Sequence, residues 1–146
     1  SVAAYGDLDD DAGLQAMVLV DDNSAPADGN IRLRVAHTAY GVGDVDIWLL
    51  GDTPTALIPD LAYGTAADAL ETAAAPLPLG IDTNDDATPE FQCDVPALPA
   101  GTIANVYASL TVDGLSLIAH TQDGNTTVIA CNPFGPTTSC NTTNTI

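Results

Sequence analysis

Apolar and polar residues alternate with a period of two along much of the chain, most clearly in residues 31–50, IRLRVAHTAYGVGDVDIWLL. Successive side chains of a strand point to opposite faces of a sheet, so this stretch predicts two half-buried strands joined by a glycine-containing loop. If the two strands form a hairpin, the expected cross-strand pairs are Val35 with Val45, Leu33 with Ile47, Arg34 with Asp46 and Arg32 with Trp48. The alternative is that Arg34 and Asp46 only lie on a solvated face.

Similar short runs recur along the chain with turn residues between them, which predicts an all-β protein. The number and spacing of these runs favour an immunoglobulin-like sandwich of about seven strands, preceded by an N-terminal β-hairpin extension. Thr65 to Ala75 is rich in alanine and is at best a short helix or coil, because Pro76 and Pro78 follow at once. The predicted strands are Val2–Tyr5, Leu14–Val20, Ile31–Ala36, Val45–Leu50, Leu77–Asp82, Phe91–Val95, Ile103–Val112, Leu115–Thr121 and Thr126–Ala130.

Two segments of the chain resemble each other, which indicates an internal repeat. SVAAYGDLDDDAGLQAMVLVDDNSAP near the start resembles ANVYASLTVDGLSLIAHTQDGNTT near the end, since each has an alternating strand, an acidic turn with glycine and a second strand. The chain is therefore expected to contain two copies of one hairpin, although any two hairpins share such a pattern. We expect a hairpin extension in residues 1–30, a sandwich domain in residues 31–130 and a tail in residues 131–146.

The charge balance restricts the partners. The 146 residues include 20 acidic residues against two arginines and no lysine, which gives a formal charge of -18. Nucleic acid is therefore excluded as a partner, because its phosphates bind lysine and arginine. Metal cations, a salt-rich medium or plain solubility explain such a charge. No run approaches the ~20 apolar residues of a membrane span, and the start SVAAYGDLDDD does not look like a signal peptide, so a processed, mature chain is expected.

Several motifs together resemble a known family. They are the alternating basic strand with His37, the Val45-Asp46-Ile47 strand, Tyr63-Gly64, PLPLGIDTNDD and LSLIAHTQDG, and they extend over most of residues 31–124. The chain is similar to a widespread, uncharacterised domain family of secreted and surface-anchored prokaryotic proteins that often occurs in tandem. The resemblance implies a β-sandwich surface module with no activity to transfer. It also implies that residues 1–30 look like the tail of a preceding repeat.

Carboxylates cluster in two turns of this lysine-free chain. Dense carboxylates are costly unless cations lie among them, and alternating oxygen donors are what calcium loops supply. Halophile-style surface charge is the alternative. The candidate calcium ligands are Asp82, Asn84, Asp86 and Glu90 in one turn and Asp7, Asp9 and Asp11 in the other.

The three cysteines fit no zinc spacing, so disulfide chemistry is expected. Cys131 and Cys140 bracket CNPFGPTTSC, whose Pro and Gly residues allow a short loop to close, so this pair is favoured over either pairing with Cys93. Asn125 and Asn141 each begin an Asn-Thr-Thr acceptor for N-glycosylation, which agrees with an extracellular chain.

No catalytic motif is present, and a lone histidine at the end of an apolar strand, such as His37, is usually a core residue bonded to a loop. We therefore expect no enzymatic activity. The expected function is that of an extracellular or cell-surface structural protein of a prokaryote, a homopolymeric, pilus-like filament assembled by β-strand addition. The alternatives are a calcium-stabilised monomeric adhesion or ligand-binding module and a hairpin that joins its own sandwich. The residues expected to mediate assembly are Val2, Ala4, Leu14, Ala16, Val18 and Val20.

Overall fold

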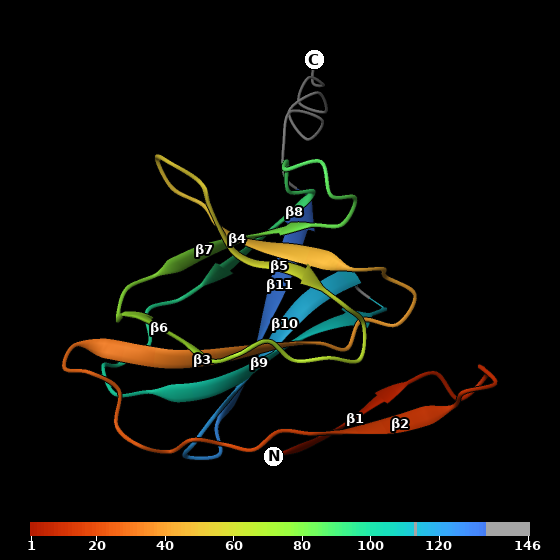
Figure 1. Cartoon of the computed structure of the whole chain (residues 1–146), viewed down its shortest axis with the longest axis horizontal. Helices are drawn as coiled ribbons and strands as arrows, with labels where there is room; N and C mark the ends of the chain where they lie inside the picture. The colour runs from red at the N-terminus through yellow and green to blue at the C-terminus, as the bar shows by residue number, and fades with distance from the viewer. Residues whose placement is uncertain (113, 134–146) are drawn as a thin grey trace.

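A computed structural model describes residues 1–112 and 114–133 (Figure 1). These residues form strands and no helix, and therefore no helix that would be long and apolar enough to cross a membrane. The strands are β1 (Val2–Gly6), β2 (Leu14–Val18), β3 (Asn30–His37), β4 (Val45–Leu49), β5 (Thr55–Leu61), β6 (Leu70–Ala73), β7 (Leu77–Asp82), β8 (Phe91–Val95), β9 (Ile103–Thr111), β10 (Gly114–Thr121) and β11 (Thr126–Pro133).

Nine of the strands form one continuous sheet in the order β5-β4-β7-β8-β11-β10-β9-β3-β6. The sheet folds over into two layers because β11 pairs with β10 through Thr126–Ala130 and then with β8 through Cys131–Pro133. All neighbouring strands are antiparallel except β3 and β9, which are parallel. The predicted all-β sandwich is confirmed.

The core lies between the two layers. Val35 on β3 and Val106 on β9 meet Ile47 on β4 and Leu79 on β7 around one small apolar space. These side chains come from strand positions that alternate with exposed ones, as the period of two predicts. The core therefore depends on both halves of residues 31–50, but as opposite walls of the sandwich.

The expected hairpin between β3 and β4 is wrong. β3 pairs with β6 and β9, whereas β4 pairs with β5 and β7, so the two strands face each other across the core. Arg34 accordingly donates to the carbonyl of Val20 and not to Asp46, and Arg32 binds Glu71 and not the Trp48 ring. The loop between the strands crosses from one layer to the other, which a local pattern does not reveal.

All nine predicted strands are present, with small shifts at their ends. Two strands, β5 and β6, were missed, so the sandwich has nine strands and not about seven. β6 lies within the Thr65–Ala75 stretch, where a short helix or coil was expected. Its Leu70 and Thr72 are half-buried, while Glu71 and Ala73 face solvent. Pairing with the edge of β3 outweighs the helical preference of a short alanine-rich segment.

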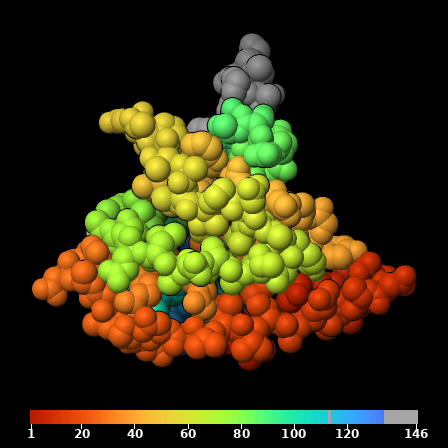
Figure 2. Space-filling view, viewed as in Figure 1, coloured from red at the N-terminus to blue at the C-terminus, as the bar shows by residue number. Residues whose placement is uncertain are grey.

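The β1–β2 hairpin forms a separate two-stranded sheet beneath the β3–β9 layer (Figure 1). It packs face-on against that layer, whereas the sequence left two alternatives, pairing with a neighbouring copy or adding two strands to its own sandwich. In Figure 2 the N-terminal segment, in red, covers one side of the molecule and its tip stands out at one end. The hairpin is thus an added third layer.

Candidate functional site

The N-terminal hairpin is the candidate site, and its two faces differ in what covers them. β1 and β2 pair in antiparallel register, with Val2 opposite Val18 and Ala4 opposite Ala16. Because side chains alternate across a strand, Met17 and Leu19 point to the opposite face from Val18. The inner face is packed on the sandwich, and the outer face is open.

The inner face is held by a small apolar cluster that is separate from the main core. Met17 and Leu19 are buried there against Ala36 of β3, with Tyr107 of β9 at the side. The residues that follow Leu19 are held by polar contacts. Asn105 on β9 donates a hydrogen bond to the Asp21 carboxylate, and Arg34 donates one to the Val20 carbonyl. Hydrogen bonds from Asn105 and Ser1 keep the pKa of Asp21 far below its usual value.

Aromatic rings hold the other end of the hairpin. Tyr5 on β1 meets Tyr63 edge to face, with ring centroids 5.5 Å apart, and Tyr63 in turn meets His37 and Tyr40 in the same way. Edge-to-face pairs of this kind stabilise a contact beyond the area they bury. Gly64 leaves room for Tyr5, since a Cβ there would lie 3.0 Å from the Tyr5 hydroxyl.

His37 is fully buried and organises this end. Its Nδ1 accepts from the N–H of Ala39 at 3.3 Å, so its Nε2–H donates to the carbonyl of Gly43 at 2.8 Å. The expectation of a core histidine bonded to a loop is confirmed. Its backbone also binds Gly64 and Thr65. His37, Tyr63 and Gly64, all part of the family-like motifs, therefore support the docked hairpin.

The six residues expected to mediate assembly are all exposed in the structure. Val2, Leu14, Val18 and Val20 are 58 to 81% exposed. A contiguous exposed apolar surface of this kind marks an interaction site more often than a solvated face. The outer face is defined here as the six exposed apolar side chains at alternating positions of the hairpin, on the side away from Met17 and Leu19: Val2, Ala4, Leu14, Ala16, Val18 and Val20.

The hairpin also has undefended edges. β1 and β2 contain no proline and no charged residue, and in the described part of the chain each pairs only with the other. The edges of the sandwich differ. β5 carries Pro59 and a kink at Asp60, where φ is 50°, and β6 has only four residues. Proline, kinks and short length are how proteins prevent unwanted pairing at an edge.

The predicted calcium loop between β7 and β8 brings together Asp82, Asp86 and Glu90, each offering an oxygen within 4.8 Å of the others. Asp82 is buried and accepts from the N–H groups of Asn84, Asp85 and Ala87 at 2.8–3.0 Å. Asn84, one of the predicted calcium ligands, contacts Asp82 through its backbone N–H. Glu90 accepts from the N–H and hydroxyl of Thr83. The loop is therefore shaped largely by its own carboxylates.

A second carboxylate group, which no motif in the sequence indicates, lies beside this loop. Asp46 on β4, Asp60 on β5 and Asp85 in the β7–β8 loop offer oxygens within 4.8 Å of one another. The negative charges of Asp46 and Asp60 raise the pKa of Asp85 above its usual 3.8. The kink in β5 turns Asp60 toward Asp46, whose carboxylate accepts the Asp60 N–H at 2.6 Å. Only the strand pairing reveals this group.

The other predicted ligands and the glycosylation acceptors lie apart. Asp7, Asp9 and Asp11 are in the hairpin turn, where Asp7 accepts from the Asp9 N–H, and among the described residues no three-carboxylate group includes them. Asn125 is exposed in the β10–β11 turn, with its amide donating to Asp123. Asn141 and Cys140 lie outside the described residues.

The disulfide differs from the expected one. Cys93 on β8 and Cys131 on β11 are bonded, with their Cα atoms 4.3 Å apart, so the predicted Cys131–Cys140 pair is wrong. The two residues are direct partners in the β8–β11 ladder. Because β11 crosses between layers, the bond lies where the sheet folds over. The sequence hid this pairing, since 38 positions separate the cysteines.

The fold and hairpin define an all-β, sandwich-like protein with a disulfide and an added N-terminal layer. Residues 1–48, which include the hairpin, β3 and most of β4, match the family model of a domain of unknown function, DUF4397. This agrees with the resemblance to an uncharacterised domain family. No curated protein matches the chain.

Proposed function

We propose that this chain is an extracellular structural protein, a subunit of a prokaryotic surface filament that assembles head-to-tail through its N-terminal hairpin. The observation that carries the proposal is a hairpin with apolar side chains on both faces. Met17 and Leu19 are covered by the sandwich, whereas Val2 and Val18 are covered by nothing in the described chain. A sheet that is apolar on both faces is typical of a position between two layers.

A second copy of the chain is the occupant that fits best. The outer face carries no charge, so it is a place where two chains of charge -18 meet without placing carboxylates in contact. The free edges of β1 and β2 allow strand addition to a neighbour. A contact between two different surfaces does not close on itself and repeats into a filament.

The free energy gained by burying the apolar side chains of the outer face is not enough by itself to hold two copies together, so the contact must include more than these side chains. Covering Val2, Leu14, Val18 and Val20 contributes about 1.5–3 kcal/mol each, or about 6–12 kcal/mol together. Association costs about 4–15 kcal/mol in lost freedom of motion. Backbone pairing at the hairpin edge supplies the remainder, so the loss of one valine weakens assembly strongly.

Location outside the cell is supported by the Cys93–Cys131 disulfide, because such bonds persist mainly in oxidising compartments. The exposed Asn125 acceptor agrees with that location.

The test uses two matched variants. Val18→Asp places a charge on the outer face, and Val128→Asp places the same charge on β11, where Val128 is 63% exposed. Sedimentation velocity of the wild type is expected to show large assemblies that grow with concentration. Val18→Asp should remain monomeric, and Val128→Asp should assemble normally. A wild type that stays monomeric at all concentrations overturns the proposal.

A calcium-stabilised monomeric adhesion or ligand-binding module is the second candidate, favoured by the two adjacent carboxylate groups. Asp82, Asp86 and Glu90 supply one set of hard oxygen donors, and Asp46, Asp60 and Asp85 supply another. If calcium binds there, chelation should lower the melting temperature by an amount that grows with occupancy. Identical melting curves with chelator and with millimolar calcium would remove this candidate.

A further inference from the structure

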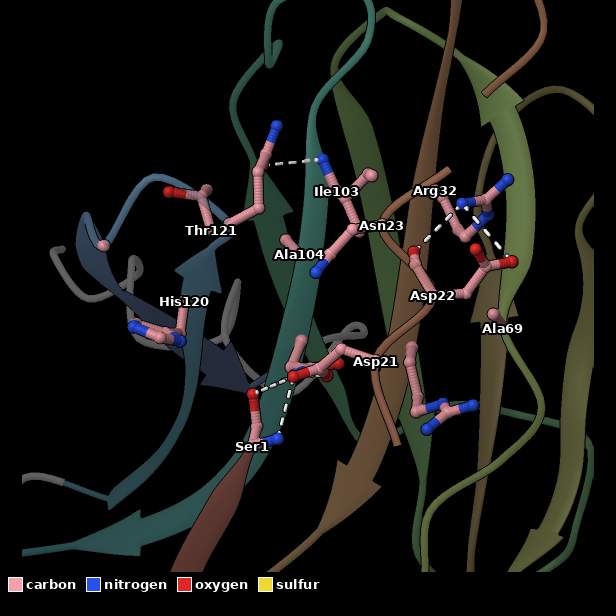
Figure 3. A pocket seen from close by; sticks show the side chains of 14 residues that line it. Ser1, Asp21, Asp22, Asn23, Arg32, Ala69, Ile103, Ala104, His120 and Thr121 are labelled. Atoms are coloured by element: carbon pink, nitrogen blue, oxygen red, sulfur yellow. Dashed lines mark hydrogen bonds and ion pairs between the residues drawn. The ribbon is translucent and has the colours of Figure 1, made fainter. Parts of the chain in front are cut away.

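Both arginines of the chain line one cavity, which lies at the base of the hairpin (Figure 3). The cavity has a volume of about 160 Å³ and is bordered by the chain that follows the hairpin on one side and by β9 and β10 on the other. His120 also lines it. In a molecule with 20 acidic residues, all the arginine and one of the two histidines therefore face a single space.

The two arginines differ in their hydrogen-bond and ion-pair partners. Arg32 is engaged, since it binds the Glu71 carboxylate at 3.1 Å and the carbonyls of Asp22 and Ser24. Arg34 is free of acidic partners within the described residues, and its hydrogen bond there goes to the carbonyl of Val20 at 3.1 Å. A guanidinium has five N–H donors. Arg34 therefore keeps charge and donors for an anionic group.

The carboxylates that line the cavity already have partners. Asp21 accepts from Asn105 at 2.9 Å and from the Ser1 hydroxyl at 2.6 Å. Asp22 accepts from Ser24 and lies 3.7 Å from Arg32. Because both carboxylates are bound to neighbours, they do not neutralise Arg34 directly.

The opposite end of the hairpin carries unpaired negative charge. Asp9 and Asp11 are exposed in the turn, and neither side chain has a hydrogen bond or ion pair to the described part of the chain. Leu8 beside them is 78% exposed. At the base, the exposed Val2 and Val18 form the last pair of the β1–β2 ladder. The tip thus combines exposed apolar surface with unpaired carboxylates, and the base combines it with the guanidinium of Arg34, which has no acidic partner in the described chain.

We propose that the acidic hairpin tip of one copy docks in the Arg34 cavity of the next copy. Asp9 or Asp11 would accept hydrogen bonds from Arg34 of the neighbouring copy, and Leu8 would pack near the neighbouring Val2 and Val18. The turn of the hairpin and the N-terminus lie at opposite ends of the hairpin (Figure 1), and the cavity is lined by Ser1 and Asp21 at the N-terminal end. The contact is therefore between unlike surfaces and propagates along one direction. This inference rests on the proposed filament and specifies its joint.

A charge-swap experiment tests the joint. The tip variant is Asp9→Arg/Asp11→Arg, and the cavity variant is Arg34→Asp. Each alone should associate at least tenfold more weakly than the wild type, because like charges then meet at every joint. An equimolar mixture should assemble again with the two variants alternating, since the acidic tip of the cavity variant fits the unchanged cavity of the tip variant, and the basic tip of the tip variant fits the cavity that carries Arg34→Asp. The readout is sedimentation velocity, after thermal melts have shown that each variant is folded.

Two controls separate an effect at the joint from an effect of net charge. Asp52→Arg/Asp94→Arg changes the net charge by the same amount at exposed positions in the β4–β5 loop and on β8, which neither pack on the hairpin nor line the cavity, and it should assemble as the wild type does. Asp9→Asn/Asp11→Asn should shorten wild-type filaments when it is added to them, since it keeps a cavity but lacks an acidic tip. This second variant keeps the proposal testable if Arg34→Asp does not fold.

The outcomes distinguish the joint from the filament itself. If the tip and cavity variants assemble normally while Val18→Asp does not, the joint is wrong and the filament stands. If the swapped mixture fails to recover, the joint is also wrong. If wild-type chains remain monomeric while glutamate or galacturonate binds in a manner that Arg34→Asp abolishes, the cavity receives a small carboxylate ligand and both proposals are overturned.

Discussion

Loss of the Cys93–Cys131 disulfide should lower the free energy of unfolding by about 4 kcal/mol, because the bond closes a loop of 38 residues in the unfolded chain. The figure follows from the chain-entropy relation, in which the entropy lost grows with the logarithm of the loop length. In urea, with a slope of about 2 kcal/mol per molar, the midpoint should fall by about 2 M.

The assay compares oxidised and reduced protein by urea denaturation, with Cys140→Ser in both samples so that the third thiol cannot exchange. Non-reducing mass analysis identifies the pair. Because the chain has no lysine and two arginines, cleavage at its many aspartates gives more useful peptides than trypsin does. A peptide from wild-type protein that links Cys131 to Cys140, or an unchanged midpoint on reduction, contradicts this reasoning.

Three further predictions concern the hairpin and its surroundings. Met17→Ala should weaken the docking of the hairpin by about 2–3 kcal/mol, because Met17 is buried against the sandwich. Amide hydrogen exchange should then become faster in β1 and β2, while the main sheet, whose core does not include Met17, stays protected. A uniform loss of protection is the contrary result. His37→Phe should cost about 1–3 kcal/mol in a urea melt, because the buried N–H of Ala39 and the Gly43 carbonyl lose their partner; equal midpoints would show that these bonds contribute nothing. Asp85→Asn should raise the melting temperature at neutral pH without calcium. The pKa of Asp85 is raised above 3.8 in the folded chain, so its ionised form opposes folding, and the advantage of the variant should vanish as the pH falls through that pKa toward 3.8. A variant less stable than the wild type at neutral pH in chelator would show that the charge repulsion is unimportant.

The sequence predicted what depends on neighbouring residues and missed what depends on strand order. Alternation located β3 and β4 correctly, because one face of each strand is buried. It did not show that β11 crosses between layers, and so it missed the Cys93–Cys131 pair. β5 was missed because Pro59 and the kink at Asp60 interrupt its alternation.

The same division holds for the candidate site. The outer-face residues of the hairpin were predicted from alternation alone, and the structure leaves them exposed. Docking of the inner face was not predicted, because it depends on Met17, Leu19 and Ala36 meeting through the fold. The group of Asp46, Asp60 and Asp85 was likewise hidden, since three separate segments supply it.

We propose that the outer face of the hairpin joins copies of the chain, and electron cryo-microscopy of the concentrated wild-type protein is the direct test. We expect filaments in which the hairpin lies between two subunits, with Val2 and Val18 covered by the neighbour and Met17 covered by its own sandwich. Dispersed single particles, or filaments in which Val2 and Val18 still face solvent, would contradict it.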